Sequence, residues 1–170
     1  AEANPALERA ASLANRCGLP LLVLFVVDPD YPEGNARHFT FMLEGLRETM
    51  AAVRARGAHF ALRRGKPPDV AAEVARRAAI VVTDRGYLRH LKDWRWQVAE
   101  DCGCLMEMVE GEVVVPVDAA SPKMETAART IRPKLHKVLG ASTALPPVVP
   151  LDRPAERLGG NADLALDDVP

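Results

Sequence analysis

Two short, unbroken runs of apolar residues constrain this fold more than any other feature. PLLVLFVV occupies residues 20–27 and AIVVT occupies residues 79–83, and an aspartate directly follows each run. Continuous apolar runs of this length, rich in β-branched residues, are typical of strands buried on both faces of a parallel sheet. The chain must therefore supply helices to cover both faces of that sheet.

The segments around these runs have helical periodicity. The clearest stripe is Phe39, Leu43, Leu46, Met50 and Val53, whose spacing of three or four residues places them on one helix face. Further helices are predicted after the N-cap Asn4 up to Gly18, at about 35–56, 70–78 and 88–102, and further strands at 59–63, 104–109 and 112–117.

This alternation predicts an α/β fold: an open, parallel, Rossmann-like three-layer sandwich with right-handed crossovers. Such sheets normally begin with a strand, whereas this sequence begins with a helix, so the usual first strand is missing or lies upstream. A sheet without that strand exposes the backbone of its neighbours. We therefore expect a tendency of the isolated chain to form a non-native dimer by strand addition.

The carboxyl-terminal part changes in character. Residues 121–139 are amphipathic but contain Pro133, which predicts a kink or two short helices. Residues 141–170 hold five of the 14 prolines and no aromatic residue, which is typical of an extended linker. We expect an α/β domain over 1–140 and a proline-rich interdomain linker or tail over 141–170.

Charge and composition exclude several classes of protein. The formal net charge of −1 gives no overall attraction to nucleic acid or anionic lipid. The longest apolar run has nine residues, far below the roughly 20 of a membrane span. Three cysteines suit a reducing cytosol, so we expect a cytoplasmic protein. Cys102 and Cys104 are too close together for the usual C-x-x-C geometry, and no metal site is predicted.

No catalytic motif is present. The sequence lacks the glycine-rich phosphate loops, the G-x-S-x-G elbow and the H-E-x-x-H pair, and its four histidines lie on different predicted elements. Ligands of open parallel sheets bind at the carboxyl ends of the strands. Asp28 and Asp84 occupy those positions, where they either contact a ligand or cap the following turn.

A basic cluster lies on the predicted helix around Pro133. Its members Arg129, Arg132, Lys134 and Lys137 are candidates for contact with nucleic acid or with another domain. A solvated basic face is the alternative, because no aromatic side chain stands beside the cluster to stack on bases.

Several segments, in order along nearly the whole chain, resemble class II DNA photolyases of the photolyase/cryptochrome family. They are NPAL at 4–7, RHFTFMLEGL at 37–46, VTD at 82–84 with LR at 88–89, VPV at 115–117 with ASPK at 120–123, AARTIRPK at 127–134 and PPVV at 146–149. The chain departs from the family pattern where Asn4-Pro5 replaces Asn-Trp and Asp118-Ala119 replaces Trp-x.

The resemblance implies the amino-terminal antenna domain of a deoxyribodipyrimidine photolyase, a carbon–carbon lyase for light-driven repair of cyclobutane pyrimidine dimers. In that family a carboxyl-terminal helical domain binds FAD and flips the lesion out of UV-damaged DNA. That domain is absent from this sequence, so no catalytic residue can be assigned. We expect the chain to partner such a domain, and not to bind FAD or repair DNA alone.

The resemblance also implies a light-harvesting pigment, a deazaflavin or another flavin, at the sheet's carboxyl edge. The candidate site consists of Asp28, Thr83 and Asp84 as hydrogen-bonding groups, Arg37 and Arg85 as charge partners, Pro29 and Leu88 as packing groups, and His38.

The alternative function is a nucleotide-binding regulatory module of the universal-stress or electron-transfer-flavoprotein type. Such a module needs a glycine-rich phosphate loop near the last strand. Residues 140–143 (GAST) are the faint candidate for it.

Overall fold

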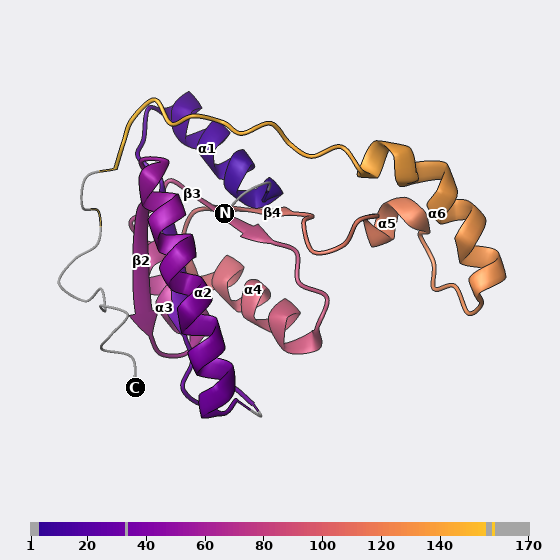
Figure 1. Cartoon of the computed structure of the whole chain (residues 1–170), viewed down its shortest axis with the longest axis horizontal. Helices are drawn as coiled ribbons and strands as arrows, with labels where there is room; N and C mark the ends of the chain where they lie inside the picture. The colour runs from indigo at the N-terminus through magenta and orange to yellow at the C-terminus, as the bar shows by residue number, and fades with distance from the viewer. Residues whose placement is uncertain (1–3, 33, 156–157, 159–170) are drawn as a thin grey trace.

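Helices and parallel strands alternate along the chain, as the sequence predicts. The computed structural model describes residues 4–32, 34–155 and 158. Figure 1 shows its elements, which are α1 (Pro5–Cys17), β1 (Leu22–Val27), α2 (Ala36–Ala55), β2 (His59–Arg64), α3 (Pro67–Ala75), β3 (Ile80–Asp84), α4 (Arg89–Asp101), β4 (Leu105–Val109), α5 (Val117–Ala120) and α6 (Ala128–Ser142).

The strands form two parallel pairs. β1 pairs with β2, with Leu22 opposite His59, and β3 pairs with β4, with Ile80 opposite Leu105. In the described residues no ladder joins β1 to β3, so the predicted open sheet is divided into two two-stranded sheets. The predicted α/β class with parallel strands is confirmed.

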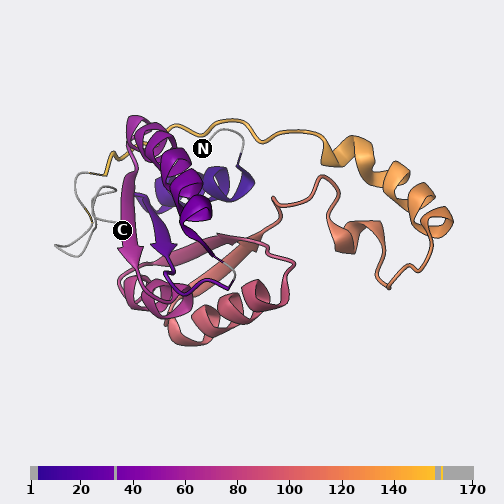
Figure 2. The same ribbon diagram turned by 60° about the horizontal axis from the view of Figure 1, so that its bottom comes forward.

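Helices cover both faces of the strands. Figure 2 shows α1 and α2 on one side and α3 and α4 on the other, which gives three layers. The α1 helix packs over β3 and β4, and α2 packs over β2. Each face therefore carries a helical layer, as the unbroken apolar runs require, although Leu105 and Met108 of β4 remain exposed.

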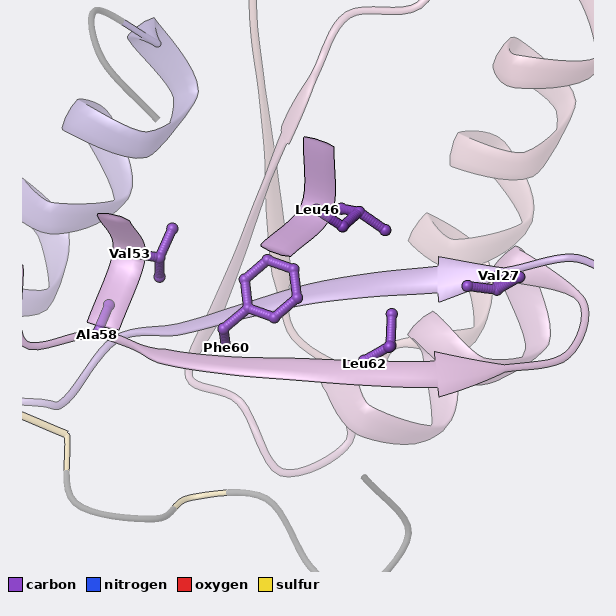
Figure 3. Packing of buried hydrophobic residues seen from close by; sticks show 6 residues of the cluster. All are labelled: Val27, Leu46, Val53, Ala58, Phe60 and Leu62. Atoms are coloured by element: carbon purple, nitrogen blue, oxygen red, sulfur yellow. The ribbon is translucent and has the colours of Figure 1, made fainter. Parts of the chain in front are cut away.

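The main core lies between α2 and the β1–β2 pair. Leu46 and Val53 from the predicted stripe of α2 are buried against Val27, Phe60 and Leu62 (Figure 3). A smaller cluster of Ala75, Val98 and Cys102 lies under the β3–β4 pair. The helical periodicity thus identifies the face that packs on the sheet.

Side chains at the helix ends satisfy backbone groups as expected. The Asn4 side chain accepts a hydrogen bond from the Leu7 amide at 2.7 Å, and Asn35 accepts one from the His38 amide at 3.1 Å. Gly18 ends α1 with a φ of 63°, a left-handed conformation that glycine adopts without a steric penalty.

One predicted strand is wrong. Residues 112–115 form bends, and the chain enters α5 at Val117. Their β-branched side chains favour an extended backbone, but a strand also needs a neighbouring edge. In the described part of the chain β4 pairs only with β3. Pro116, which has no amide hydrogen to donate, instead becomes the N-cap of α5.

The predicted division at Pro133 into two short helices is also wrong. α6 runs through Pro133 without interruption, and residues 121–127 lie outside it. Proline at the sixth helical position removes one backbone hydrogen bond, and the bonds on either side maintain the helix. Because α6 extends to Ser142, the boundary predicted at residue 140 falls inside this helix.

The predicted linker returns to the body of the molecule. We call residues 146–155 the strap; Figure 1 shows this chain running back from α6 across α1. Its Val149 amide donates to the Glu8 carboxylate at 2.7 Å, and its Ala155 amide donates to the Gly57 carbonyl at 2.7 Å. Leu151 packs against the main core. Residues 156, 157 and 159–170 of the predicted tail lie outside the described residues.

No helix among the described residues has the length and apolar character that crossing a membrane requires.

Candidate functional site at the carboxyl ends of the strands

A cavity of about 1620 Å³ separates the two strand pairs. One part, which we call the strand groove, is lined by every residue of β1 and of β3. The other part, the carboxyl-edge pocket, lies where these strands end. Its lining residues are Asp28, Tyr31, His38, Phe39, Thr83, Asp84, Leu91, Trp94 and Arg95. This is the position at which open parallel sheets bind ligands.

Three aromatic rings join the two halves of the molecule at this edge. Tyr31, in the loop after β1, meets His90 and Trp94 of α4 edge-on, with ring centroids 5.8 and 6.2 Å apart. The Tyr31 hydroxyl lies 3.1 Å from the His90 ring nitrogen Nε2. The cluster therefore links the end of β1 to the helix that follows β3.

Asp84, the last residue of β3, accepts hydrogen bonds from two side chains of other elements. Asn4 donates to its carboxylate at 3.4 Å, and Arg95 donates to its backbone carbonyl. The backbone of Gly111 passes close by, since a side chain there would place its Cβ 3.1 Å from the same carboxylate. These contacts fix Asp84 at the rim of the pocket.

The structure brings four of the eight predicted pigment-site residues to this cavity. Asp28, His38, Thr83 and Asp84 line it. Asp28 also accepts a hydrogen bond from the Asp30 amide at 2.9 Å, which is the turn-capping role that the sequence left open.

The other four, Pro29, Arg37, Arg85 and Leu88, do not line the cavity. Arg85 pairs with Asp118 of α5 at 2.6 Å, and this hydrogen bond raises the pKa of the guanidinium above its usual value. Leu88 is the N-cap of α4 with its side chain exposed, and Pro29 and Arg37 are also exposed. The charge-pairing role proposed for Arg85 is thus taken by a protein carboxylate.

The basic cluster of α6 is only partly available to a partner. Lys134 donates to Glu125 and, at 3.1 Å, to the Ser121 hydroxyl. The hydrogen bond from Lys134, with others from Ser121 and Thr130, lowers the pKa of Glu125 to about 2. Arg129, Arg132 and Lys137 are exposed. Lys134 therefore stabilises the turn before α6, whereas the other three cations face solvent.

Cys102 is buried and Cys104 is partly buried, and both thiols donate hydrogen bonds within the fold. Burial raises the pKa of the Cys104 thiol, and Cys102 donates to the Cys104 carbonyl at 3.2 Å. A protonated thiol is a weak nucleophile and a weak metal ligand. Among the described residues no three histidine, cysteine or acidic side chains are grouped as a metal site would require.

The candidate phosphate loop of the alternative function has no loop geometry. Gly140 lies within α6, and residues 141–143 complete the end of that helix. Its backbone amides are committed to helical hydrogen bonds, so they cannot surround a phosphate.

Two groups of interacting residues are missing from the sequence prediction. One is the aromatic cluster, in which Tyr31 contacts two rings of α4 that lie at least 59 positions away along the sequence. The other is Glu8, buried in α1 and paired with Arg56 at 2.7 Å. A glutamate within the alanine-rich face of a predicted helix is the one signal that could have revealed the second group.

Comparison with known proteins agrees with the fold. A family model described as DNA photolyase matches residues 1–155. The deoxyribodipyrimidine photo-lyase of Methanothermobacter thermautotrophicus is 41% identical over 136 residues, which are 80% of this chain and 31% of that protein. The Oryza sativa subsp. japonica enzyme of the same name is 36% identical over 162 residues, covering 88% of this chain and 32% of the enzyme.

Two solved structures share the architecture. An archaeal photolyase from Sulfolobus tokodaii superimposes with a TM-score of 0.72 at 15% identity, covering 96% of this chain and 37% of that one. A Synechocystis cryptochrome superimposes with a TM-score of 0.71 at 14% identity, covering 95% and 36%. The chain thus spans about a third of the length of the curated relatives above. By this family match and these identities, the chain belongs to the DNA photolyase family.

Proposed function

We propose that this chain is the light-harvesting and scaffold domain of a cyclobutane pyrimidine dimer photolyase, with a flavin or deazaflavin bound in the carboxyl-edge pocket. The observation that carries the proposal is the pocket itself, which combines aromatic side chains with hydrogen-bonding groups at the strand ends. Small-molecule sites in proteins are mostly apolar, with a few polar groups that fix orientation.

The residues present fit a planar, polar-edged ring system. Trp94 and Phe39 offer apolar surface against which such a ring packs, and the carboxylates of Asp28 and Asp84 accept hydrogen bonds from ring N–H or ribityl hydroxyl groups. When bound, the pigment would absorb light and pass the excitation to the catalytic flavin. The protein's own part is to orient the ring and exclude water from one side of it.

The archaeal photolyase from Sulfolobus tokodaii was crystallised with two FAD molecules, which were taken to imply a novel light-harvesting cofactor. That finding supports including FAD itself among the pigments to be tested.

Pigment binding is tested by equilibrium dialysis of the purified chain against FAD, FMN and 8-hydroxy-5-deazaflavin, with absorption spectra of the retained pigment. The proposal predicts that Trp94→Ala weakens binding about tenfold, because lost ring packing is worth about 1.4 kcal/mol. Trp96→Ala is the matched control: Trp96 lies on the same helix, is 70% exposed and does not line the cavity. Binding that is absent, or equally sensitive to both substitutions, contradicts the proposal.

We further propose that repair of dimers in UV-damaged DNA requires this chain to be joined to a carboxyl-terminal helical domain that binds FAD. The chain alone is expected neither to hold a catalytic FAD nor to repair DNA. An oligonucleotide with one thymine dimer, illuminated with the chain alone and with the chain joined to a helical domain, tests this expectation. Light-dependent repair by the 170-residue chain would contradict it.

The exposed cations of α6 are proposed to contact that helical domain or the DNA. Arg129, Arg132 and Lys137 project from an element that stands away from the sheets in Figure 1. Changing the three to alanine in the joined protein should weaken either domain association or DNA affinity. Titration with DNA at two salt concentrations separates these outcomes, since phosphate contacts are salt-dependent. Unchanged affinity and association would contradict this assignment.

A further inference from the structure

The strap is bound to the α/β body through its backbone as well as by packing. Asn15 of α1 contacts the backbone on either side of Leu151. Its side-chain amide donates to the Pro150 carbonyl at 2.8 Å, and its side-chain carbonyl accepts from the Asp152 amide at 3.0 Å. One amide side chain thus uses a donor and an acceptor on a single extended segment. Main-chain contacts of this kind give proteins their affinity for extended peptides.

Further contacts continue along the strap in both directions. Val149 is held at both of its backbone groups, since its amide donates to Glu8 at 2.7 Å and its carbonyl accepts from Arg56 at 3.2 Å. Toward the other end, the Ala155 amide donates to the Gly57 carbonyl at 2.7 Å. We call the body residues that contact the strap through hydrogen bonds the strap site; they are Glu8, Asn15, Gly18, Arg56 and Gly57.

The side chains of the strap add a preference for sequence. Leu151 packs against the main core, and Arg153 donates to the Gly18 carbonyl at 3.0 Å. Proline fixes φ at a value that suits an extended chain, which lowers the entropy lost when a segment is ordered on a surface. Four of the ten strap residues are prolines, at positions 146, 147, 150 and 154. The strap site therefore suits an extended, proline-rich segment with a leucine at its centre.

The chain reaches the strap through α5 and α6, which stand away from the strands in Figures 1 and 2. Neither helix contains a buried residue. One contact of this α5–α6 unit with the body is the ion pair of Arg85 with Asp118, whose side chain is 70% exposed. Exposed ion pairs contribute little to stability. The α5–α6 unit can therefore swing outward, and carry the strap with it, without opening the core.

We propose that the strap site also binds the strap of a second copy of this chain, so that two copies exchange residues 146–155 and form a dimer. The exchanged form keeps every strap contact described above, because each site meets the same segment, and only the path of residues 110–145 differs. The population of this dimer rises with protein concentration. No sheet edge and no part of the carboxyl-edge pocket takes part, so the exchange is independent of strand addition and of the pigment proposal.

The test separates the strap and its site onto two variants of the full chain. Leu151→Asp places a charge where the leucine packs, so this chain has an intact site and a strap that does not dock. Asn15→Ala removes the hydrogen bonds to Pro150 and Asp152, so this chain has an intact strap and a weakened site. The two chains are mixed in equal amounts and examined by sedimentation velocity, and circular dichroism of each chain checks that it is folded.

The matched control for Leu151→Asp is Val148→Asp, because Val148 belongs to the same strap and is 65% exposed. The Val148→Asp chain keeps its own strap docked, so its site is already filled. The proposal predicts a one-to-one complex of the Leu151→Asp and Asn15→Ala chains. This complex should bind at least about tenfold more tightly than either chain binds itself, or than Val148→Asp binds Asn15→Ala. Absence of the complex would overturn the proposal.

The wild-type chain gives a second measurement that depends on no variant. Unlabelled and ¹⁵N-labelled copies are unfolded together in urea, refolded at high concentration and analysed by native mass spectrometry. The proposal predicts dimers of mixed isotope content. An excess of the peptide PPVVPLDRPA, the sequence of residues 146–155, should reduce them at least about fivefold, whereas PPVVPDDRPA should not. Refolding to monomers alone would overturn the proposal, and so would dimers that resist the first peptide, because another surface would then hold them together.

Discussion

Glu8 shows how one residue connects distant parts of this molecule. Its side chain is 3% exposed, and its two carboxylate oxygens accept from Arg56 at 2.7 and 2.8 Å and from the Val149 amide at 2.7 Å. One buried carboxylate therefore joins α1, the end of α2 and the strap. Removing one member of such a buried pair leaves the other without compensation.

We predict that Glu8→Ala lowers the free energy of unfolding by about 3 kcal/mol and frees the strap. Urea denaturation measures the first effect, and limited proteolysis between residues 143 and 155 measures the second. Glu48→Ala is the control, because Glu48 is an exposed residue of α2. Equal stability of the two variants would show that the Glu8 pair makes no net contribution.

The pH dependence of this contact follows from the pKa of Glu8. Burial raises that pKa, but the hydrogen bonds from Arg56 and Val149 outweigh burial, so it lies below its usual value. A group with a lowered pKa stabilises the fold above its unfolded pKa of about 4.3 and loses this contribution as the pH falls further.

We therefore predict a constant stability difference between the wild type and Glu8→Gln above about pH 5. The difference should shrink as the pH falls below about 4, where the wild-type carboxyl becomes protonated and neutral like glutamine. Urea midpoints at pH 7, 5, 4 and 3 for both proteins measure it. A difference that is the same at pH 3 and pH 7 would contradict the role of the carboxylate charge.

At the level of single residues, the sequence alone predicts which residues end the strands, but not which distant side chains pair with one another. The positions of Asp28 and Asp84 at the strand ends are predictable, because each directly follows an apolar run that forms a strand. Sequence reasoning assigns Arg85 to the pigment site, but the folded chain pairs it with Asp118, which lies 33 positions away and could not be identified as its partner from the sequence. Glu8 and Arg56 are likewise separated by 48 positions.

Among the elements, the start of α4 depends on one glycine. A Cβ on Gly86 would lie 2.5 Å from Arg95 Nη1 and 2.8 Å from Leu91 Cβ. Arg95 in turn donates to the carbonyls of Asp84 and Leu91. The absence of a side chain at Gly86 therefore lets α4 approach the end of β3.

We predict that Gly86→Ala lowers the free energy of unfolding by about 1–3 kcal/mol, because the added methyl displaces Arg95 and overpacks the contact. Gly45→Ala should instead raise it by about 0.5–1 kcal/mol, since Gly45 lies in α2 with nothing within 4 Å of an added Cβ. Thermal denaturation of both variants measures the two effects. Stabilisation by both substitutions would show that α4 can move away freely.

Elements were predictable where a single segment determines its own structure. Caps, glycines and apolar periodicity define α1, α2 and the four strands, and these need no knowledge of distant partners. Residues 112–117 have the composition of a strand but no edge beside them, and an edge is a property of the assembled sheet. The continuation of α6 through Pro133 was also not predictable from Pro133 alone, because it depends on the backbone hydrogen bonds of the residues on either side.

At the level of the whole molecule, the described residues show few interactions between the α5–α6 unit and the rest of the α/β domain. Arg85 pairs with Asp118, and Tyr87 accepts from the Val117 amide at 3.4 Å. The turn before α6 depends on Lys134 with Glu125 and Ser121. Regions with few buried contacts open at lower free energy than the core.

We predict that amides of α6 exchange with deuterium faster than those of β2, whose first four residues are buried. Lys134→Ala should accelerate exchange in residues 121–134, because the turn loses the ammonium that pairs with Glu125. Lys137→Ala, an exposed change on the same helix, should leave that exchange unaltered. Equal acceleration by both substitutions would show that losing any positive charge from α6 has this effect, and would contradict a specific role for the Lys134–Glu125 pair.

The strap also has a consequence for the order in which the molecule assembles. The Glu8–Val149 hydrogen bond closes a segment 141 positions long, whereas Glu8–Arg56 closes one of 48. Closing a longer loop costs more chain entropy, and during synthesis residue 149 leaves the ribosome long after α1 and α2. We therefore expect Arg56 to pair with the Glu8 carboxylate while the α/β body forms, before the Val149 amide does. Docking of the strap is then expected to be a late folding event, after the layers beneath it have packed.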